Sequence, residues 1–138
     1  MDIFTPKSSK LKVPLVEGIR AGFPSPAEDF AEPTLDLNHY VIKNPASTFY
    51  ARITGDNMEG AGISDGDIVV IDKSLEPKDG NIAVCFIDGE FTLKRILLDK
   101  GHLWLQPANH KFKAIEITEE NHFLVWGIVT HVVKNLYL

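Results

Sequence analysis

The sequence has one cysteine, no long hydrophobic run and no run of basic residues. The single cysteine, Cys85, cannot form an internal disulfide, and its apolar surroundings at 82–87 predict a buried thiol in a reducing compartment. No apolar segment approaches the ~20 residues of a membrane-spanning helix, and residues 1–12 lack the apolar core of a signal peptide. We therefore expect a cytoplasmic protein without membrane contact.

Positive charge and metal-binding patterns are also scarce. The net charge is −5 and lysine and arginine are not clustered, so we expect no direct sequence-specific DNA binding. Any link to DNA would pass through protein partners. There is no glycine-rich phosphate loop, and no metal-ligand spacing among the histidines, so we expect neither a metal nor a cofactor. The histidines are His39, His102, His110, His122 and His131.

What is present is a pattern of short strands. A chain of 138 residues with 44% hydrophobic composition is long enough for one domain with a core. From residue 34 to 138 apolar segments alternate with turn residues, among them the hairpin signal Asp88-Gly89, which predicts a compact antiparallel β domain. Strands are expected at 49–53, 68–72, 81–87, 90–98, 102–106, 114–118 and 123–133.

Residues 1–33 predict an extended N-terminal arm. They contain five prolines, and neither helical nor strand periodicity persists for more than a few residues. They also hold more apolar residues than a free tail needs, so we expect the arm to lie across the domain surface. The segment 35–40, just after it, is compatible with either a helical turn or a short strand.

Three motifs stand in a fixed order along the chain. Ala21-Gly22 precedes Phe23-Pro24-Ser25-Pro26, the turn Gly55-Asp56-Asn57-Met58 leads to Asp65-Gly66-Asp67, and the strand from Glu90 to Arg95 carries Lys94. Together they resemble the LexA/UmuD family of self-cleaving Ser-Lys peptidases, and the resemblance extends from about residue 20 to 133. It implies a mostly β, β-clip-like domain of the LexA/UmuD C-terminal type, with an extended arm in front of it.

The resemblance also assigns roles to the motif residues. In the family a serine in the turn attacks a bond in the protein's own arm, and a lysine on a later strand acts as its base. Asn57 occupies the position of this serine, and Lys94 matches the general base. Ala21-Gly22 matches the cleavage dipeptide, and the remaining turn residues support the nucleophile position; these are Gly55, Asp56 and Met58.

Strand alternation gives Lys94 a suitable environment. It places Lys94 on one face of its strand with Thr92 and Ile96, opposite Phe91 and Leu93. An exposed lysine has a pKa of about 10.4 and is a poor base near neutrality, whereas burial can lower that pKa by several units. We therefore expect Lys94 to be shielded from water and within hydrogen-bonding reach of Asn57.

Asn57 departs from the family pattern. Its amide nitrogen is delocalised into the carbonyl, so a lysine cannot turn it into a nucleophile, and we expect no self-cleavage by this sequence. A shifted turn is disfavoured because Gly55, Asp56 and Met58 all match. Two explanations stay open, which are a deliberate replacement of serine and a natural protein that has lost cleavage.

The resemblance implies a function in the SOS response to DNA damage. It suggests a homodimeric accessory subunit of an error-prone translesion polymerase, whose arm is removed when RecA filaments on single-stranded DNA stimulate cleavage, and which then joins a UmuC-like Y-family polymerase. Fewer than ~25 residues precede the cleavage dipeptide, too few for a helix-turn-helix domain, which favours the UmuD branch.

Two other functions stay open. One is a pseudo-protease dimer that regulates partners through an intact arm. The other is the separated dimerisation and protease domain of a LexA-type or phage-type repressor. The sequence also leaves open whether the arm docks in its own cleft or in that of its partner subunit.

Overall fold

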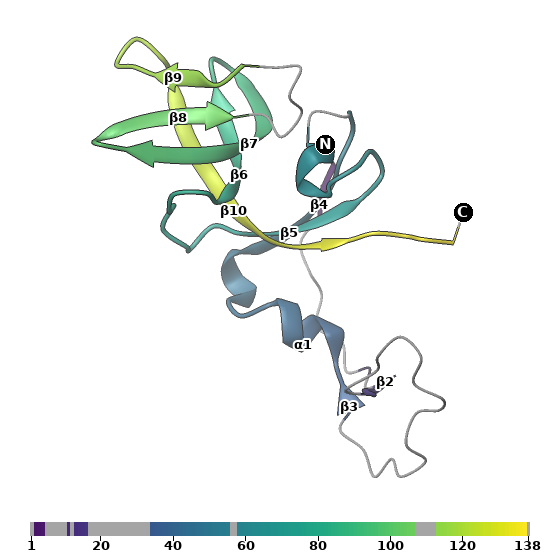
Figure 1. Cartoon of the computed structure of the whole chain (residues 1–138). Helices are drawn as coiled ribbons and strands as arrows, with labels where there is room; N and C mark the ends of the chain where they lie inside the picture. Colours follow the sequence, from purple (N-terminus) through teal and green to yellow (C-terminus); the bar gives the residue numbers. More distant parts are fainter. Residues whose placement is uncertain are drawn as a thin grey trace. The chain divides into compact units, whose positions relative to one another are not determined.

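The structure, a computed structural model, describes residues 2–4, 11, 13–16, 34–55, 58–106 and 113–137 (Figure 1). The chain divides into two compact units, one formed by residues 1–6 and 44–138 and the other by residues 7–43. The predicted boundary between an arm at 1–33 and a domain at 34–138 stays a prediction.

The main unit is built on one eight-stranded sheet in which every pairing is antiparallel. The predicted mostly β, antiparallel fold is therefore confirmed. The strand order is β1-β4-β5-β10-β6-β7-β8-β9. The strands are β1 (Asp2–Phe4), β4 (Thr48–Arg52), β5 (Ile68–Asp72), β6 (Ile82–Ile87), β7 (Glu90–Asp99), β8 (His102–Gln106), β9 (Ile115–Ile117) and β10 (Phe123–Val133). Two short 3-10 turns, η1 (Pro45–Ser47) and η2 (Glu59–Ala61), flank β4.

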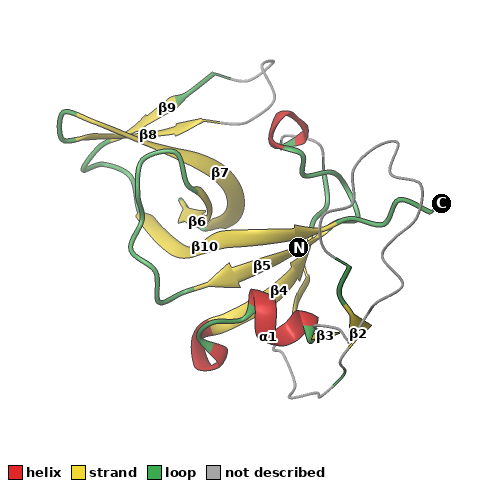
Figure 2. Cartoon of the chain, turned by 60° about the horizontal axis from the view of Figure 1, so that its bottom comes forward, coloured by secondary structure: helices red, strands yellow, loops and turns green. Residues whose placement is uncertain are grey.

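Strand β10 joins the two halves of this sheet. Its first half pairs with β6 and its second half with β5, and both figures show it between these strands (Figures 1 and 2). The pairing register shifts between Val125 and Gly127, and again between Val129 and His131. A Cβ atom on Gly127 would lie 2.5 Å from Cγ2 of Ile71, so this close approach of β10 to β5 needs a glycine.

Two hairpins with the same type of turn connect strands β6, β7 and β8. Asp88 and Gly89 connect β6 to β7 with φ angles of 46° and 90°, and Lys100 and Gly101 connect β7 to β8 with 49° and 81°. Positive φ at both central residues is the signature of the tight turn that matches strand twist, so the predicted Asp88-Gly89 turn is confirmed.

The core consists of two clusters of buried side chains, and β6 contributes to both because its side chains alternate between faces. Val84 belongs to the first cluster, whereas Ala83 and Cys85 belong to the second. The other buried members of the first cluster are Ala51, Ile53, Met58, Ile63, Val69, Ile71 and Leu93. Those of the second are Ile96, Leu105 and Ile128.

A buried carboxylate fixes the point where the chain enters the main unit. Asp72, at the end of β5, accepts hydrogen bonds from the side chains of Asn44 at 2.7 Å and Ser47 at 3.0 Å. It also accepts hydrogen bonds from the backbone amide of Ser74 at 2.8 Å and from the Ser74 hydroxyl at 2.7 Å. Burial raises the pKa of Asp72, but these four bonds outweigh it and hold the pKa below its usual value.

Strand β1 lies in the segment for which the sequence predicts an extended arm and no strand. Asp2, Ile3 and Phe4 pair with Arg52, Ala51 and Tyr50 of β4, so these three residues form one edge of the sheet. The chain therefore starts on the main unit, passes through residues 7–43, and returns to the main unit at Asn44.

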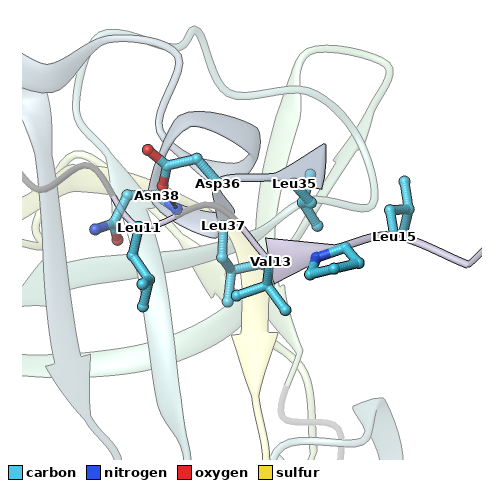
Figure 3. A pocket seen from close by; sticks show the side chains of 8 residues that line it. Leu11, Val13, Leu15, Leu35, Asp36, Leu37 and Asn38 are labelled. Atoms are coloured by element: carbon cyan, nitrogen blue, oxygen red, sulfur yellow. Dashed lines mark hydrogen bonds between the residues drawn. The ribbon is translucent and has the colours of Figure 1, made fainter. Parts of the chain in front are cut away.

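The second unit holds a short antiparallel pair, β2 (Val13–Pro14) with β3 (Thr34–Leu35), and the helix α1 (Leu37–Val41). The Asp36 side chain caps this helix by accepting the Asn38 amide at 3.1 Å. Segment 35–40 thus contains both structures that the sequence allowed. Mostly apolar side chains line a pocket of about 400 Å³ in this unit (Figure 3). Of the predicted site residues that the structure describes, namely Gly55, Met58 and Lys94, none lines it.

Candidate functional site

The first part of the predicted site is the loop between β4 and β5. Backbone hydrogen bonds join the start of this loop to its end. The Ile53 amide donates to the Asp67 carbonyl at 2.8 Å, and the Gly66 amide donates to the Ile53 carbonyl at 2.7 Å. The loop that carries the predicted nucleophile position therefore begins at a fixed point beside the start of β5.

Hydrogen bonds and burial hold the described residues of the motif, Gly55 and Met58. The Gly55 amide donates to Oδ1 of Asp65 at 3.0 Å, and the φ of 99° at Gly55 is one that glycine adopts readily. On the other side, the Met58 carbonyl accepts the amides of Ala61 and Ile63 at 3.0 and 3.2 Å. The Met58 side chain is only 1% exposed. Gly55 and Met58 are thus anchored, and their role in supporting the nucleophile position stays a prediction.

The same core brings the turn and strand β7 together. Met58 follows Asn57 in the sequence, Leu93 precedes Lys94, and both Met58 and Leu93 belong to the first core cluster. Strand β7 alternates as predicted, because Leu93 lies in the first cluster and Ile96 in the second. Lys94 has the same parity as Ile96, which places it on the face of the second cluster.

Lys94 is half-buried and lies opposite Ala83 of β6 in the strand register. Burial disfavours the charged ammonium and lowers the pKa of Lys94, while interaction with the Cys85 thiol acts in the opposite direction. Burial also raises the pKa of Cys85 to about 12, against the effect of the Lys94 charge. A lysine with a lowered pKa is neutral more often near physiological pH, and so it is a better proton acceptor.

A second lysine in this region was missed by the sequence analysis. Lys134, just after β10, forms an ion pair with Oδ2 of Asp67 and donates to the Ser64 hydroxyl at 3.1 Å. Asp67 Oδ2 also accepts the Ser64 amide at 2.8 Å. We name these three residues the Asp67 clasp. Since Lys134 donates to Ser64 while paired with a carboxylate, it is not placed to accept the Ser64 proton.

The clasp changes the titration of its carboxylate. Burial raises the pKa of Asp67, but the hydrogen bonds from Lys134 and the Ser64 amide, with the Lys134 charge, lower it below its usual value overall. Asp67 is therefore ionised near neutrality. The Asp65-Gly66-Asp67 motif was found in the sequence, but the contacts of its carboxylates, with Gly55 and Lys134, depend on the fold.

Four predicted site residues lie outside the described residues, namely Asp56, Asn57, Ala21 and Gly22. The separation of Lys94 from Asn57 and the position of the cleavage dipeptide accordingly stay predictions. Among the described residues, no group of three or more His, Cys, Asp or Glu side chains could hold a metal ion. No helix in the described part of the chain is long and apolar enough to cross a membrane.

Comparison with known proteins places this arrangement in a family. Residues 14–130 match the peptidase S24-like family. Protein ImpA of Escherichia coli is 45% identical over 114 residues, which cover 83% of this chain and 77% of ImpA. Protein MucA of Escherichia coli is 40% identical over 117 residues, covering 84% of this chain and 80% of MucA. A LexA repressor from Anaeromyxobacter dehalogenans is 30% identical over 133 residues, which cover 95% of this chain but 58% of that repressor.

The chain belongs to the peptidase S24-like family. Within this family it is UmuD-like, as the sequence motifs predicted, because its higher identities and more complete coverage are to ImpA and MucA rather than to the LexA repressor.

Proposed function

We propose that this protein is a UmuD-like accessory subunit of an error-prone translesion DNA polymerase in the SOS response. Its relatives support the UmuD branch, because the chain spans 77% of ImpA and 58% of the LexA repressor. In this proposal the protein is a cytoplasmic homodimer, RecA filaments on single-stranded DNA act on its arm, and a UmuC-like Y-family polymerase is its partner.

The environment of Lys94 is the observation that carries the peptidase part of the proposal. Lys94 is half-buried on its strand, and burial lowers its pKa. A strand lysine without a chemical role is more often exposed and charged. These features suit a general base that serves the turn at Asn57.

With a serine at position 57 the chemistry would run as follows. The neutral amine of Lys94 takes the hydroxyl proton while the oxygen attacks the carbonyl carbon of Ala21. The bond to Gly22 then breaks, the Gly22 nitrogen receives the proton from Lys94, and residues 1–21 remain as an ester. Water hydrolyses this ester, which frees the arm and restores the hydroxyl.

Asn57 stops this sequence at its first step. An amide nitrogen is not made nucleophilic by a neutral lysine, so the chain as written keeps its arm. This favours a second function, in which the intact dimer regulates the same partners by binding alone. The two functions differ in whether the arm is ever removed.

Restoring the serine tests the first function directly. We expect Asn57→Ser to cut the chain between Ala21 and Gly22, with a rate that rises as the pH approaches the pKa of Lys94, and RecA filaments to allow the reaction near neutrality. Mass spectrometry would detect fragments 1–21 and 22–138. The unchanged chain should stay whole under the same conditions.

Two results would contradict this account. If Asn57→Ser stays intact at alkaline pH with RecA filaments present, position 57 is not that of the nucleophile or the arm does not reach it. If the unchanged chain cuts itself at Ala21-Gly22, a residue other than Asn57 performs the reaction.

The dimer is a separate expectation. The final strand β10 carries exposed apolar side chains at Val132 and Val133, which a second subunit could cover. Sedimentation at micromolar concentration should give twice the chain mass of 15.4 kDa. A monomer at all concentrations tested would remove dimerisation from the proposal.

A further inference from the structure

Strand β1 covers one edge of the main sheet. Its three residues pair with β4 in the register Asp2 with Arg52, Ile3 with Ala51 and Phe4 with Tyr50. Without β1, the next strand inward, β4, would present a row of unpaired backbone amides and carbonyls. Such an edge is a template for another extended chain.

The hold of β1 on β4 depends on its connection to the rest of the chain. The side chains of Ile3 and Phe4 remain 38% and 49% exposed, so a large part of their apolar surface stays in contact with water. Three paired residues form a weak contact between separate molecules. A tether keeps the local concentration of the strand in the millimolar range, and cutting the tether removes this advantage.

We propose that the edge of β4 is a docking site for an extended segment of a partner protein, and that β1 occupies it until the arm is released. Release by cleavage requires a serine at position 57 and rests on the proposed function, because the cleavage dipeptide Ala21-Gly22 lies between β1 and β4 in the chain. The edge itself does not depend on cleavage, since any process that detaches β1 exposes it.

The chemistry of β4 defines the partner segment. Arg52 is exposed and lies opposite Asp2 in the register, so an acidic residue suits this position. Ala51 is fully buried and Tyr50 half-buried, and they lie opposite Ile3 and Phe4. The segment that fits is an extended strand with an acidic residue followed by two large apolar residues, added through main-chain hydrogen bonds.

The test detaches β1 without cutting the chain. In the full chain, Ile3→Pro combined with Phe4→Pro removes two successive amides, one of which must face β4 because neighbouring amides point to opposite sides of a strand. A fluorescent peptide of residues 1–8 then serves as the probe of an acidic-apolar-apolar strand. We expect the double variant to bind it at least tenfold more tightly than the unchanged chain, as measured by fluorescence anisotropy.

Three controls make the result specific. The same peptide with both proline substitutions should bind neither protein. The double variant Ile3→Ala with Phe4→Ala, which keeps both amides, should give a smaller gain and serves as the test variant if the prolines prevent folding. With Arg52→Glu added to the proline variant, binding should be lost, and a peptide carrying Asp2→Lys should restore it.

Hydrogen exchange shows where the peptide binds. In the proline variant the β4 amides that face β1 should exchange faster, while those that face β5 and the amides of β5 and β10 stay protected, and the peptide should restore protection to the first group. Equal peptide affinity for the variant and the unchanged chain, or protection at another strand, would overturn the proposal.

The outcome is independent of the cleavage chemistry. The experiment uses chains with Asn57 in place, so failure of Asn57→Ser to cut would leave the binding result unaffected. Conversely, an edge that rejects the peptide would not contradict self-cleavage.

Discussion

Lys94 and Lys134 lie in the same unit, both next to elements of the predicted site, but in opposite chemical surroundings. Lys134 is paired with the Asp67 carboxylate at the surface, whereas among the described residues no carboxylate forms an ion pair with Lys94. Lys94 lies on the face of Cys85, and burial lowers its pKa. The contrast teaches that desolvation, and not the presence of an amine, distinguishes a base from a structural cation.

The largest effect should be on the cleavage rate when each of the two lysines is replaced singly by alanine in an Asn57→Ser background. Lys94→Ala should lower the cleavage rate by at least ~10²-fold, which is the usual contribution of a general base. Lys134→Ala should lower it by less than about tenfold, because Lys134 acts only through the clasp that holds the turn. Rates would be measured by mass spectrometry of the cut chain across a pH series.

The pH profile separates the two roles further. The midpoint of the alkaline rise should be unchanged by Lys134→Ala, since that lysine does not take the proton. Lys78→Ala, at an exposed position in the same unit, controls for loss of positive charge and should cleave like the parent. Rapid cleavage by the Lys94→Ala variant would contradict the assignment of the base.

A smaller effect is expected on stability from Asp67→Asn. The substitution weakens the charged hydrogen bonds of the clasp, so it should cost about 1–2 kcal/mol at neutral pH, toward the low end because Lys134 is partly exposed. Since the folded-state pKa of Asp67 lies below its unfolded value, the stabilisation is complete above about pH 4 and is lost as the pH falls through the folded pKa.

Urea unfolding at neutral and acidic pH would measure this. The difference between the unchanged chain and Asp67→Asn should shrink as the pH falls below about 4. Asp65→Asn is the matched control, because Asp65 is not part of the clasp and contacts the Gly55 amide instead. A difference that stays constant down to low pH would show that the carboxylate charge is not what stabilises the clasp.

The smallest expected signal concerns Cys85, the thiol on the side of the core where Lys94 lies. Its pKa of about 12 and complete burial should leave it unreactive toward thiol reagents in the folded protein. Because Cys85 is the single cysteine of the sequence, all labelling by a thiol reagent can be assigned to it. We expect complete labelling in denaturant and less than about a tenth of that in the same time without it. Rapid labelling of the native chain would mean that this face is open to water, which would also weaken the case for Lys94.

The strands of the main unit could be predicted from the sequence where local signals agree. The bounds expected for 68–72, 102–106 and 123–133 are those of β5, β8 and β10, because apolar runs end at clear turns. Burial of Cys85 follows from the same pattern. In the candidate site, the strand that carries Lys94 was predictable from the sequence, whereas the assignment of Gly55 and Met58 to a catalytic turn stays a prediction.

What the sequence could not provide depends on contacts between distant residues. Lys134 follows Asp67 by 67 positions, and nothing near either residue indicates the pair. Likewise β1 has only three residues, too few for periodicity, and it is a strand only because the edge of β4 is available. The position of Asn57 relative to Lys94 has the same long-range character and awaits the serine experiment.

Strand β10 has a consequence for how the protein is made. It is the last strand of this sequence, yet it lies between β5 and β6 in the middle of the sheet. While the ribosome is still adding residues before 123, the β4–β5 pair and the β6–β9 hairpins have no strand to join them. Contacts of such large sequence separation form slowly. The sheet can therefore close only after β10 has been synthesised, and until then the edges of β5 and β6 that β10 will cover are open to pairing with other chains.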